Sequence, residues 1–88
     1  MKLILAIIQD ADNDRVSSAL TQEGYRVTFI ASTGGFLRSG RSTLLIGTEE
    51  DSVPKALEII RERCSQPKDP AEKRATIFVV DVEKFTQL

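Results

Sequence analysis

The order of elements along the sequence predicts an α+β fold of the ferredoxin-like type, βαββαβ, with a four-stranded antiparallel sheet. Two observations support this prediction. Short apolar runs of strand length are separated by two segments in which apolar residues recur at helical spacing. A right-handed crossover then places the third strand between the first two strands, which are parallel, and puts both helices on one face of the sheet. The 88 residues are expected to form one domain over residues 1–88.

The first 24 residues of the sequence predict a strand followed by a helix. The apolar run over residues 2–8 is too short for an amphipathic helix and is typical of a central strand buried on both faces. The helix should run from about Asp12 to Glu23 and stop at Gly24. A metal site before it is disfavoured, because the chain has no histidine and the spacing matches no calcium loop. The favoured interpretation is a capped helix with a solvated first turn, begun by Asp10, Asp12, Asn13 and Asp14.

Side chains alternate along the second strand, which is predicted from Tyr25 to Ser32. Arg26 and Thr28 project from one face, and Tyr25 and Val27 belong to the other. This pattern alone favours a solvent-exposed sheet face for Arg26 and Thr28. Their position directly before a glycine-rich segment indicates instead that they belong to a binding site.

Residues 32–43 have the composition of a binding site rather than of a simple connection. Three of the five glycines lie here, so the backbone can adopt positive φ angles and approach a ligand closely. Successive amide groups in such a segment can bind an anion, and Arg38 and Arg41 add guanidinium groups suited to phosphate. Phe36 and Leu37 add apolar surface. The segment therefore suits a ligand that is part phosphate and part aromatic base.

The third strand is predicted from Thr43 to Thr48, returning antiparallel to the second. Gly47 interrupts it, and a glycine inside a strand often marks a bulge or a close approach by a ligand. From Gly24 to Thr48 there are three arginines and no acidic residue, a local charge of +3, whereas the rest of the chain sums to −4. A small anion fits this one basic region better than a long polyanion does.

The second helix and the last strand complete the pattern. The helix is expected to run to about Cys64, whose place on the buried stripe indicates a small core hydrophobe rather than a catalytic thiol. Residues 65–74 form a polar surface loop, and Ala75 to Val82 form the last strand. Two helices cover only one face of a sheet, so a second copy of the chain is expected to cover the other.

Composition argues against several classes of function. A net charge of −1 gives no support for binding a nucleic-acid polymer. No run approaches the roughly 18 apolar residues that span a bilayer, so a cytoplasmic protein without membrane contact is expected. An enzyme is disfavoured, because the chain has no histidine, no Walker A sequence and no activated nucleophile.

Three stretches of the sequence carry information beyond these patterns: residues 1–10 (Met-Lys-Leu-Ile-Leu-Ala-Ile-Ile-Gln-Asp), residues 33–40 (Thr-Gly-Gly-Phe-Leu-Arg-Ser-Gly) and the ending over residues 78–88. In these stretches the sequence resembles the PII-like cyclic di-AMP receptor family of bacteria. The resemblance implies a ferredoxin-like homotrimer that binds cyclic di-AMP in the clefts between subunits and has no enzymatic activity. It also implies a longer loop before the last strand than residues 65–74 provide.

The resemblance further implies which residues contact the ligand. Arg26 would pair with phosphate or base, the loop amides would hold phosphate, and Phe36 or Phe78 would contact adenine. Arg41 stands where the family has a short amide side chain, and its charge keeps it among the candidates. The full set of expected ligand contacts is Arg26, Thr28, Gly35, Phe36, Leu37, Arg41, Gly47 and Phe78.

Three hypotheses for the function remain open. In the first, the protein binds cyclic di-AMP and relays its occupancy through its loops to an unidentified downstream protein. In the second, it is a PII-like sensor of another adenine nucleotide, such as ATP or AMP. In the third, it is a scaffold that holds a protein partner through Phe36 and Leu37 and binds no small ligand.

Overall fold

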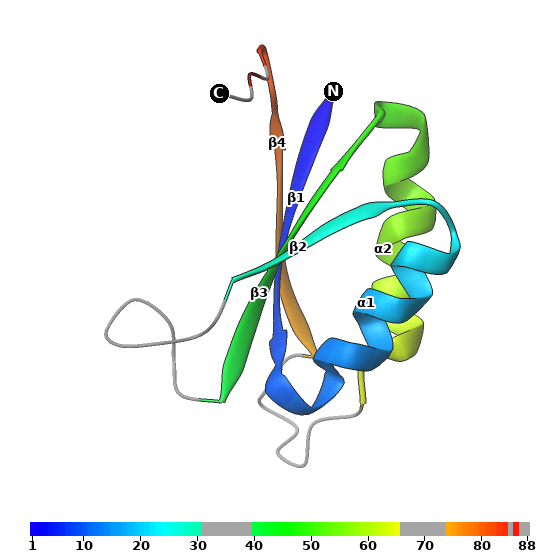
Figure 1. The fold of residues 1–88 in the computed structure, drawn as a ribbon, viewed down its shortest axis with the longest axis vertical. Helices are drawn as coiled ribbons and strands as arrows, with labels where there is room; N and C mark the ends of the chain where they lie inside the picture. Colours follow the sequence, from blue (N-terminus) through cyan, green and yellow to red (C-terminus); the bar gives the residue numbers. More distant parts are fainter. Residues whose placement is uncertain (31–39, 66–73, 85, 87–88) are drawn as a thin grey trace.

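The computed structural model describes residues 1–30, 40–65, 74–84 and 86. Each helix is preceded by a short 3-10 turn, η1 (Asp10–Asp12) or η3 (Glu50–Ser52). The order βαββαβ that the sequence predicts is confirmed (Figure 1). The strands and helices are β1 (Lys2–Gln9), α1 (Asn13–Gln22), β2 (Arg26–Ile30), β3 (Arg41–Thr48), α2 (Val53–Arg63) and β4 (Ala75–Asp81).

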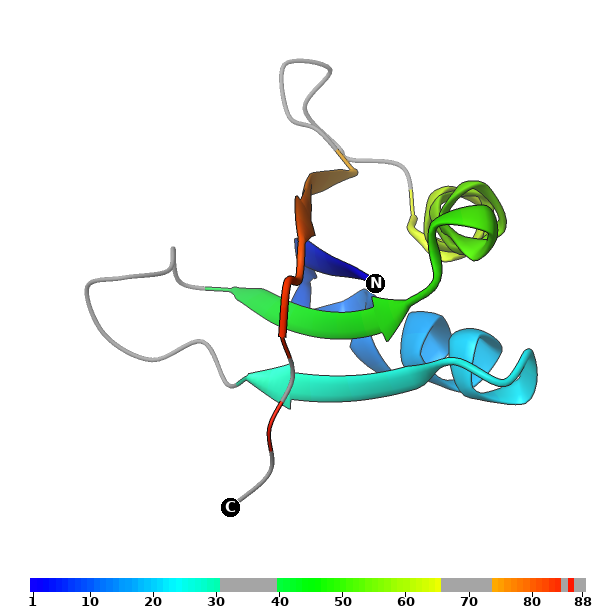
Figure 2. The same cartoon turned by 90° about the horizontal axis from the view of Figure 1, so that it is seen from above.

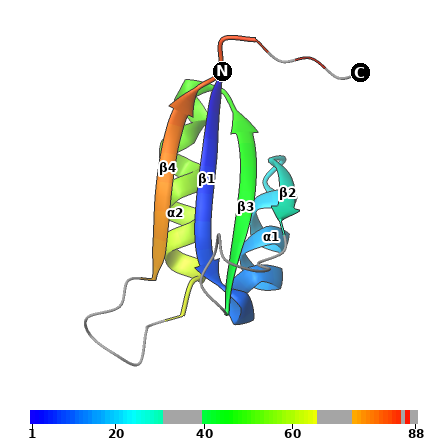
Figure 3. The ribbon, with the colours of Figure 1, turned by 90° about the vertical axis from the view of Figure 1, so that its left-hand side faces the viewer.

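The four strands form one sheet in the order β2-β3-β1-β4, and all neighbouring strands are antiparallel. The third strand therefore lies between the first two, as the crossover rule predicts. Both helices lie on one side of this sheet (Figure 2). Figure 3 shows the other side, with the four strands in front and the helices behind them. The predicted ferredoxin-like α+β fold is thus confirmed.

The hydrophobic core lies between the sheet and the two helices. On the two central strands, β1 and β3, the apolar side chains that point toward the helices are fully buried, because both helices present an apolar stripe to them. On β1 these side chains alternate with residues of the opposite face, as expected for a strand. The fully buried residues of this core are Ile4, Ala6, Ile8, Val16, Leu20, Leu44, Ile46, Ala56 and Ile60.

The second face of the sheet is apolar at its centre and is covered by neither α1 nor α2 (Figure 3). We call it the open face. On β1 it carries Leu3, Leu5 and Ile7, which are half-buried. On β4 it carries Phe78 and Val80, whose exposed fractions are 52% and 44%. The prediction that β1 is apolar on both faces is therefore confirmed, and neither α1 nor α2 covers the second of these faces (Figure 3).

Element boundaries agree with the sequence to within two residues where both ends are described. Helix α1 is followed by Gly24 at φ +90°, the left-handed conformation expected of a helix stop. Strand β3 begins at Arg41, two residues earlier than predicted, because Arg41 still pairs with Gln9 at the end of β1.

The cap expected for the first helix is not formed, and the second helix begins in the same way. Asp12 and Ser52 are the N-cap residues of α1 and α2, yet neither side chain makes a capping hydrogen bond. Both residues have helical backbone angles, since each continues a 3-10 turn into the helix. Side-chain capping needs an extended N-cap residue, so this geometry excludes it. The prediction of a solvated first turn is also wrong for Asp12, which is fully buried.

Candidate ligand-binding site

A hollow of about 460 Å³ lies on the open face, at the end of the sheet where β1 begins. The register of β2 and β3 places Arg26 opposite Gly47 and Thr28 opposite Leu45. These four residues share one face because directly paired residues point to the same side of a sheet. The hollow is lined by Met1, Leu3, Arg26, Thr28, Leu45, Gly47 and Val82. Three of the predicted ligand contacts, Arg26, Thr28 and Gly47, are therefore brought together.

Arg26 is the charged group of this hollow. Its side chain is exposed, and in the described part of the chain no acidic residue forms an ion pair with it. The guanidinium group is thus available for a bidentate contact with phosphate. Thr28 adds a hydroxyl group from the same strand, and Leu3 and Leu45 add apolar walls. The hollow combines the two kinds of surface that a nucleotide requires.

Gly47 is approached in this structure by a side chain. A Cβ atom placed on Gly47 would lie 2.8 Å from Cε of Met1, closer than side-chain atoms normally come. Sequence reasoning expected a bulge or a close ligand at this glycine. It missed Met1, because the contact depends on the pairing of β1 with β3, which are far apart in the sequence.

Phe78 lies on the open face but at the opposite edge of the sheet. Thr28 pairs with Leu45, Leu45 with Leu5, and Leu5 with Phe78, so these residues form one row across the four strands. Three interstrand spacings separate Thr28 from Phe78, a distance of about 14 Å. Within one subunit, Phe78 is therefore on the same face as the hollow but not part of it.

Arg41 is at the other end of β3 from Gly47. Six residues separate the two positions along the strand, which corresponds to about 20 Å. Arg41 pairs with Gln9 at the last position of β1, beside the glycine-rich segment. Gly35, Phe36 and Leu37, in that segment, lie outside the described residues.

The end of the glycine-rich segment is attached to the turn η1. The backbone N–H of Asp10 donates to the carbonyl oxygen of Gly40 at 2.8 Å, and the hydroxyl of Ser42 donates to Asp10 Oδ1. Gly40 has φ +84°, a conformation that a residue with a side chain rarely adopts. Asp10, the first acidic residue of the segment predicted to cap the helix, thus forms hydrogen bonds with residues at the start of β3.

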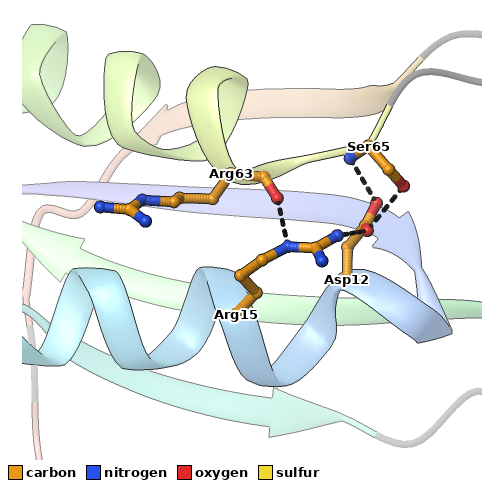
Figure 4. Close-up of polar contacts among 4 residues, drawn as sticks. All are labelled: Asp12, Arg15, Arg63 and Ser65. Atoms are coloured by element: carbon orange, nitrogen blue, oxygen red, sulfur yellow. Dashed lines mark hydrogen bonds and ion pairs between the residues drawn. The ribbon is translucent and has the colours of Figure 1, made fainter.

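Asp12 ties η1 to the end of α2 (Figure 4). Its Oδ2 accepts a hydrogen bond from the Ser65 backbone N–H at 3.1 Å, and its Oδ1 accepts one from the Ser65 hydroxyl at 2.8 Å. Arg15 forms an ion pair with the same carboxylate and donates from Nε to the carbonyl oxygen of Arg63 at 2.9 Å. These partners, rather than a metal ion, account for the buried charge. Among the described residues, no group of three or more metal-binding side chains is present.

Thr43 is a further polar group that sequence reasoning did not single out. It is 7% exposed, and its Oγ1 has no hydrogen-bond partner among the described residues. It pairs with Ile30 and Ile7 on the open face, between the hollow and Arg41. A buried hydroxyl without a partner costs free energy, which makes Thr43 a candidate donor to a ligand on this face.

Cys64 behaves as the sequence predicts. It is buried with an exposed fraction of 7%, and burial raises the pKa of its thiol to about 11. A thiol with so high a pKa is protonated at neutral pH and is a poor nucleophile.

In residues 1–30, 40–65 and 74–84, no helix is long and apolar enough to cross a bilayer.

An exposed arginine and a threonine thus lie beside an apolar hollow on a ferredoxin-like sheet, an arrangement that suits a small ligand with an anionic group. The family model described as "Cyclic-di-AMP receptor" matches residues 1–70. The chain belongs to this family, and as a member it is a non-enzymatic signalling protein. A crystal structure titled "a functionally unknown protein from Pediococcus pentosaceus ATCC 25745" is similar, with a TM-score of 0.78 and 36% sequence identity over 99% of this chain and 96% of that chain.

Proposed function

We propose that the protein binds cyclic di-AMP in the clefts between the subunits of a homotrimer and relays its occupancy through its loops to a downstream protein. One observation carries this proposal. Among the predicted contacts that the structure describes, Arg26 and Thr28 lie on the edge strand β2 and Phe78 lies on the opposite edge strand β4, all on the open face. A single subunit offers half of a site at each edge. Two subunits that meet at these edges complete one site.

The chemistry of each half supports a dinucleotide ligand. Arg26 binds a phosphate, and the apolar walls of the hollow contact an adenine base. Phe78, which is half exposed, stacks on an adenine base of the ligand that is bound in the hollow of the neighbouring subunit. Gly35, Phe36 and Leu37, in the segment between β2 and β3, remain proposed contacts, as does Arg41 at the start of β3.

The open face supports the assembly. Leu5, Leu45 and Phe78 form an apolar row along it, and accessible apolar surface of this kind marks interaction sites. A closed ring of identical subunits buries it without leaving an edge. We therefore propose that the open faces of three subunits line the centre of a trimer, with the helices outside.

Isothermal titration with cyclic di-AMP tests the ligand. We expect saturable binding at about one ligand per chain. Removal of the charged hydrogen bonds in Arg26→Ala should weaken binding roughly tenfold or more. Arg63→Ala, which removes an exposed arginine from α2 on the other side of the sheet, is the matched control and should bind normally. No saturable binding up to millimolar cyclic di-AMP rejects the proposal, and stronger competition by ATP or AMP replaces it with the second hypothesis.

A mixing experiment tests whether each site is shared. Arg26→Ala and Phe78→Ala should each bind poorly when alone, because every site lacks one contact. After the two variants are unfolded and refolded together, random assortment leaves about a quarter of the interfaces with both native residues. Recovery of that fraction of tight sites is the expected result. If mixing recovers no binding, the two residues do not serve the same site across an interface.

A further inference from the structure

We infer that the side chain of Met1 is a movable wall of the ligand hollow and contacts the base of the bound nucleotide. This inference rests on the proposed function, since it concerns the same hollow. It adds a specificity-determining residue that neither the glycine-rich segment nor the charge pattern of the sequence indicates. It is carried by the placement of Met1 relative to Gly47 and Val82.

The backbone of Met1 is held by a hydrogen bond, while about half of the residue is exposed. Its carbonyl oxygen accepts a hydrogen bond from the backbone N–H of Val82, just beyond β4, at 2.9 Å. The residue as a whole is nevertheless 49% exposed. Methionine has three rotatable side-chain bonds and fits surfaces of irregular shape. The anchored backbone therefore keeps a flexible thioether at the mouth of the hollow.

The missing side chain of Gly47 determines where this thioether lies. Because Gly47 has no Cβ, the Met1 methyl group can rest on the β3 backbone; an added Cβ would be 2.8 Å from Cε. The space over Gly47, beside Arg26, is thus occupied by the Met1 side chain in this structure. A ligand that reaches Gly47 must displace the methyl group or pack against it.

The surroundings of Met1 favour packing against a flat base. Leu3, Leu45 and Val82 make this part of the hollow apolar, while Arg26 and Thr28 stand on the β2 side. A phosphate directed to Arg26 leaves the base of the same nucleotide on the apolar side. Sulfur makes favourable contacts with aromatic rings. The ligand class that fits is a purine nucleotide with its base on the thioether.

The sequence makes the test unusually direct, because Met1 is the only methionine in the chain. Protein labelled with ¹³C at the methionine methyl group should give one resonance in an NMR spectrum, and its intact mass confirms that Met1 is retained. We expect this resonance to move by more than its linewidth on saturation with cyclic di-AMP. Gly47→Ala should move it without any ligand, which verifies the contact. Arg26→Ala with cyclic di-AMP, at a concentration below its weakened affinity, is the control and should leave it unchanged.

Oxidation provides the second readout. Conversion of Met1 to the sulfoxide makes the wall polar and should weaken binding roughly two- to tenfold, the range expected for loss of a sulfur–aromatic contact. If wild-type protein binds cyclic di-AMP by titration while the methyl resonance and the affinity of the oxidised protein stay unchanged, the role of Met1 is rejected and the receptor proposal stands. If titration detects no binding to wild-type protein, the receptor proposal fails, and the role of Met1 fails with it.

Discussion

The two faces of the sheet use the same strands for different purposes. Leu44 and Leu45 are adjacent on β3, yet Leu44 is fully buried against the helices and Leu45 lies half-buried on the open face beside the ligand hollow. The helix-covered face holds the folded chain together. The open face carries further apolar residues, which we propose contact other subunits. Strand alternation alone thus divides the apolar residues of this small chain between the two faces.

The largest expected effect comes from breaking the helix-covered face. Leu44→Ala leaves a cavity in a closed core and should lower the free energy of unfolding by about 2–5 kcal/mol. Denaturation by urea, followed by circular dichroism, measures this loss. For a chain of 88 residues with a correspondingly modest core, a loss of this size is a large part of the total stability.

Leu45→Ala is the matched variant on the open face. In dilute protein, this substitution should lower the free energy of unfolding by much less than Leu44→Ala does, because Leu45 is only half-buried in the subunit. Its effect should grow at protein concentrations where subunits associate. Equal losses for the two variants at all concentrations would mean that the open face is not an interface.

A second, smaller effect should come from the polar contacts that close the helix layer. Asp12→Asn removes the charge that pairs with Arg15 and replaces an acceptor of the Ser65 contacts. We expect a loss of about 1–3 kcal/mol, typical of a buried group left without its partner. Asp14→Asn, an exposed position on the first turn of α1, is the control and should change stability little. A value for Asp12→Asn as small as that of the control would show that the buried contacts contribute nothing.

Periodicity is the reason that so much of the fold is predictable from the sequence. Alternation along β2 is enough to assign Arg26 and Thr28 to one face, and the apolar run of β1 indicates that both of its faces need cover. These inferences use only local spacing, which the strand geometry converts directly into direction. The structure places Arg26 and Thr28 on one face of the sheet and apolar residues of β1 on both faces. What covers the open face stays a prediction.

Contacts between distant segments are not predictable in this way. An aspartate before a helix has the same sequence signature whether it caps the helix or is buried under another one, so the prediction for Asp12 is wrong. Met1 reaches Gly47 only because β1 pairs with β3, and Thr43 is left without a partner among the described residues by the packing around it. Each of these features depends on which segments meet, and a local pattern does not contain that information.

The smallest expected effect concerns the end row of the helix-covered face, where Lys2 of β1 pairs with Asp81 of β4. The next pair of residues along β1 and β4, on the open face, is apolar, with Leu3 opposite Val80. At this end of the two strands, the charged pair therefore lies on the helix-covered face. The hydrogen bond and the charge of Lys2 lower the pKa of Asp81, and those of Asp81 raise the pKa of Lys2. A lowered aspartate pKa contributes stability that is present above the ordinary value of about 3.9 and is lost as the pH falls through the lower folded value.

Asp81→Asn should therefore lower the urea midpoint slightly at neutral pH and leave it unchanged once the wild-type carboxyl is protonated. At high pH the ion pair has a second limit. Because the pKa of Lys2 is raised, its contribution to stability is lost only as the pH rises through the pKa of Lys2 in the folded protein. The carboxylate of Asp81 is exposed to solvent, so added salt should shrink the neutral-pH difference. Midpoints measured from acid to neutral pH at low and high salt test this. If the urea midpoints of wild type and Asp81→Asn still differ at acid pH, the difference arises from packing at the end of the sheet. The ion pair of Lys2 with Asp81 would then not be the cause of the stability difference.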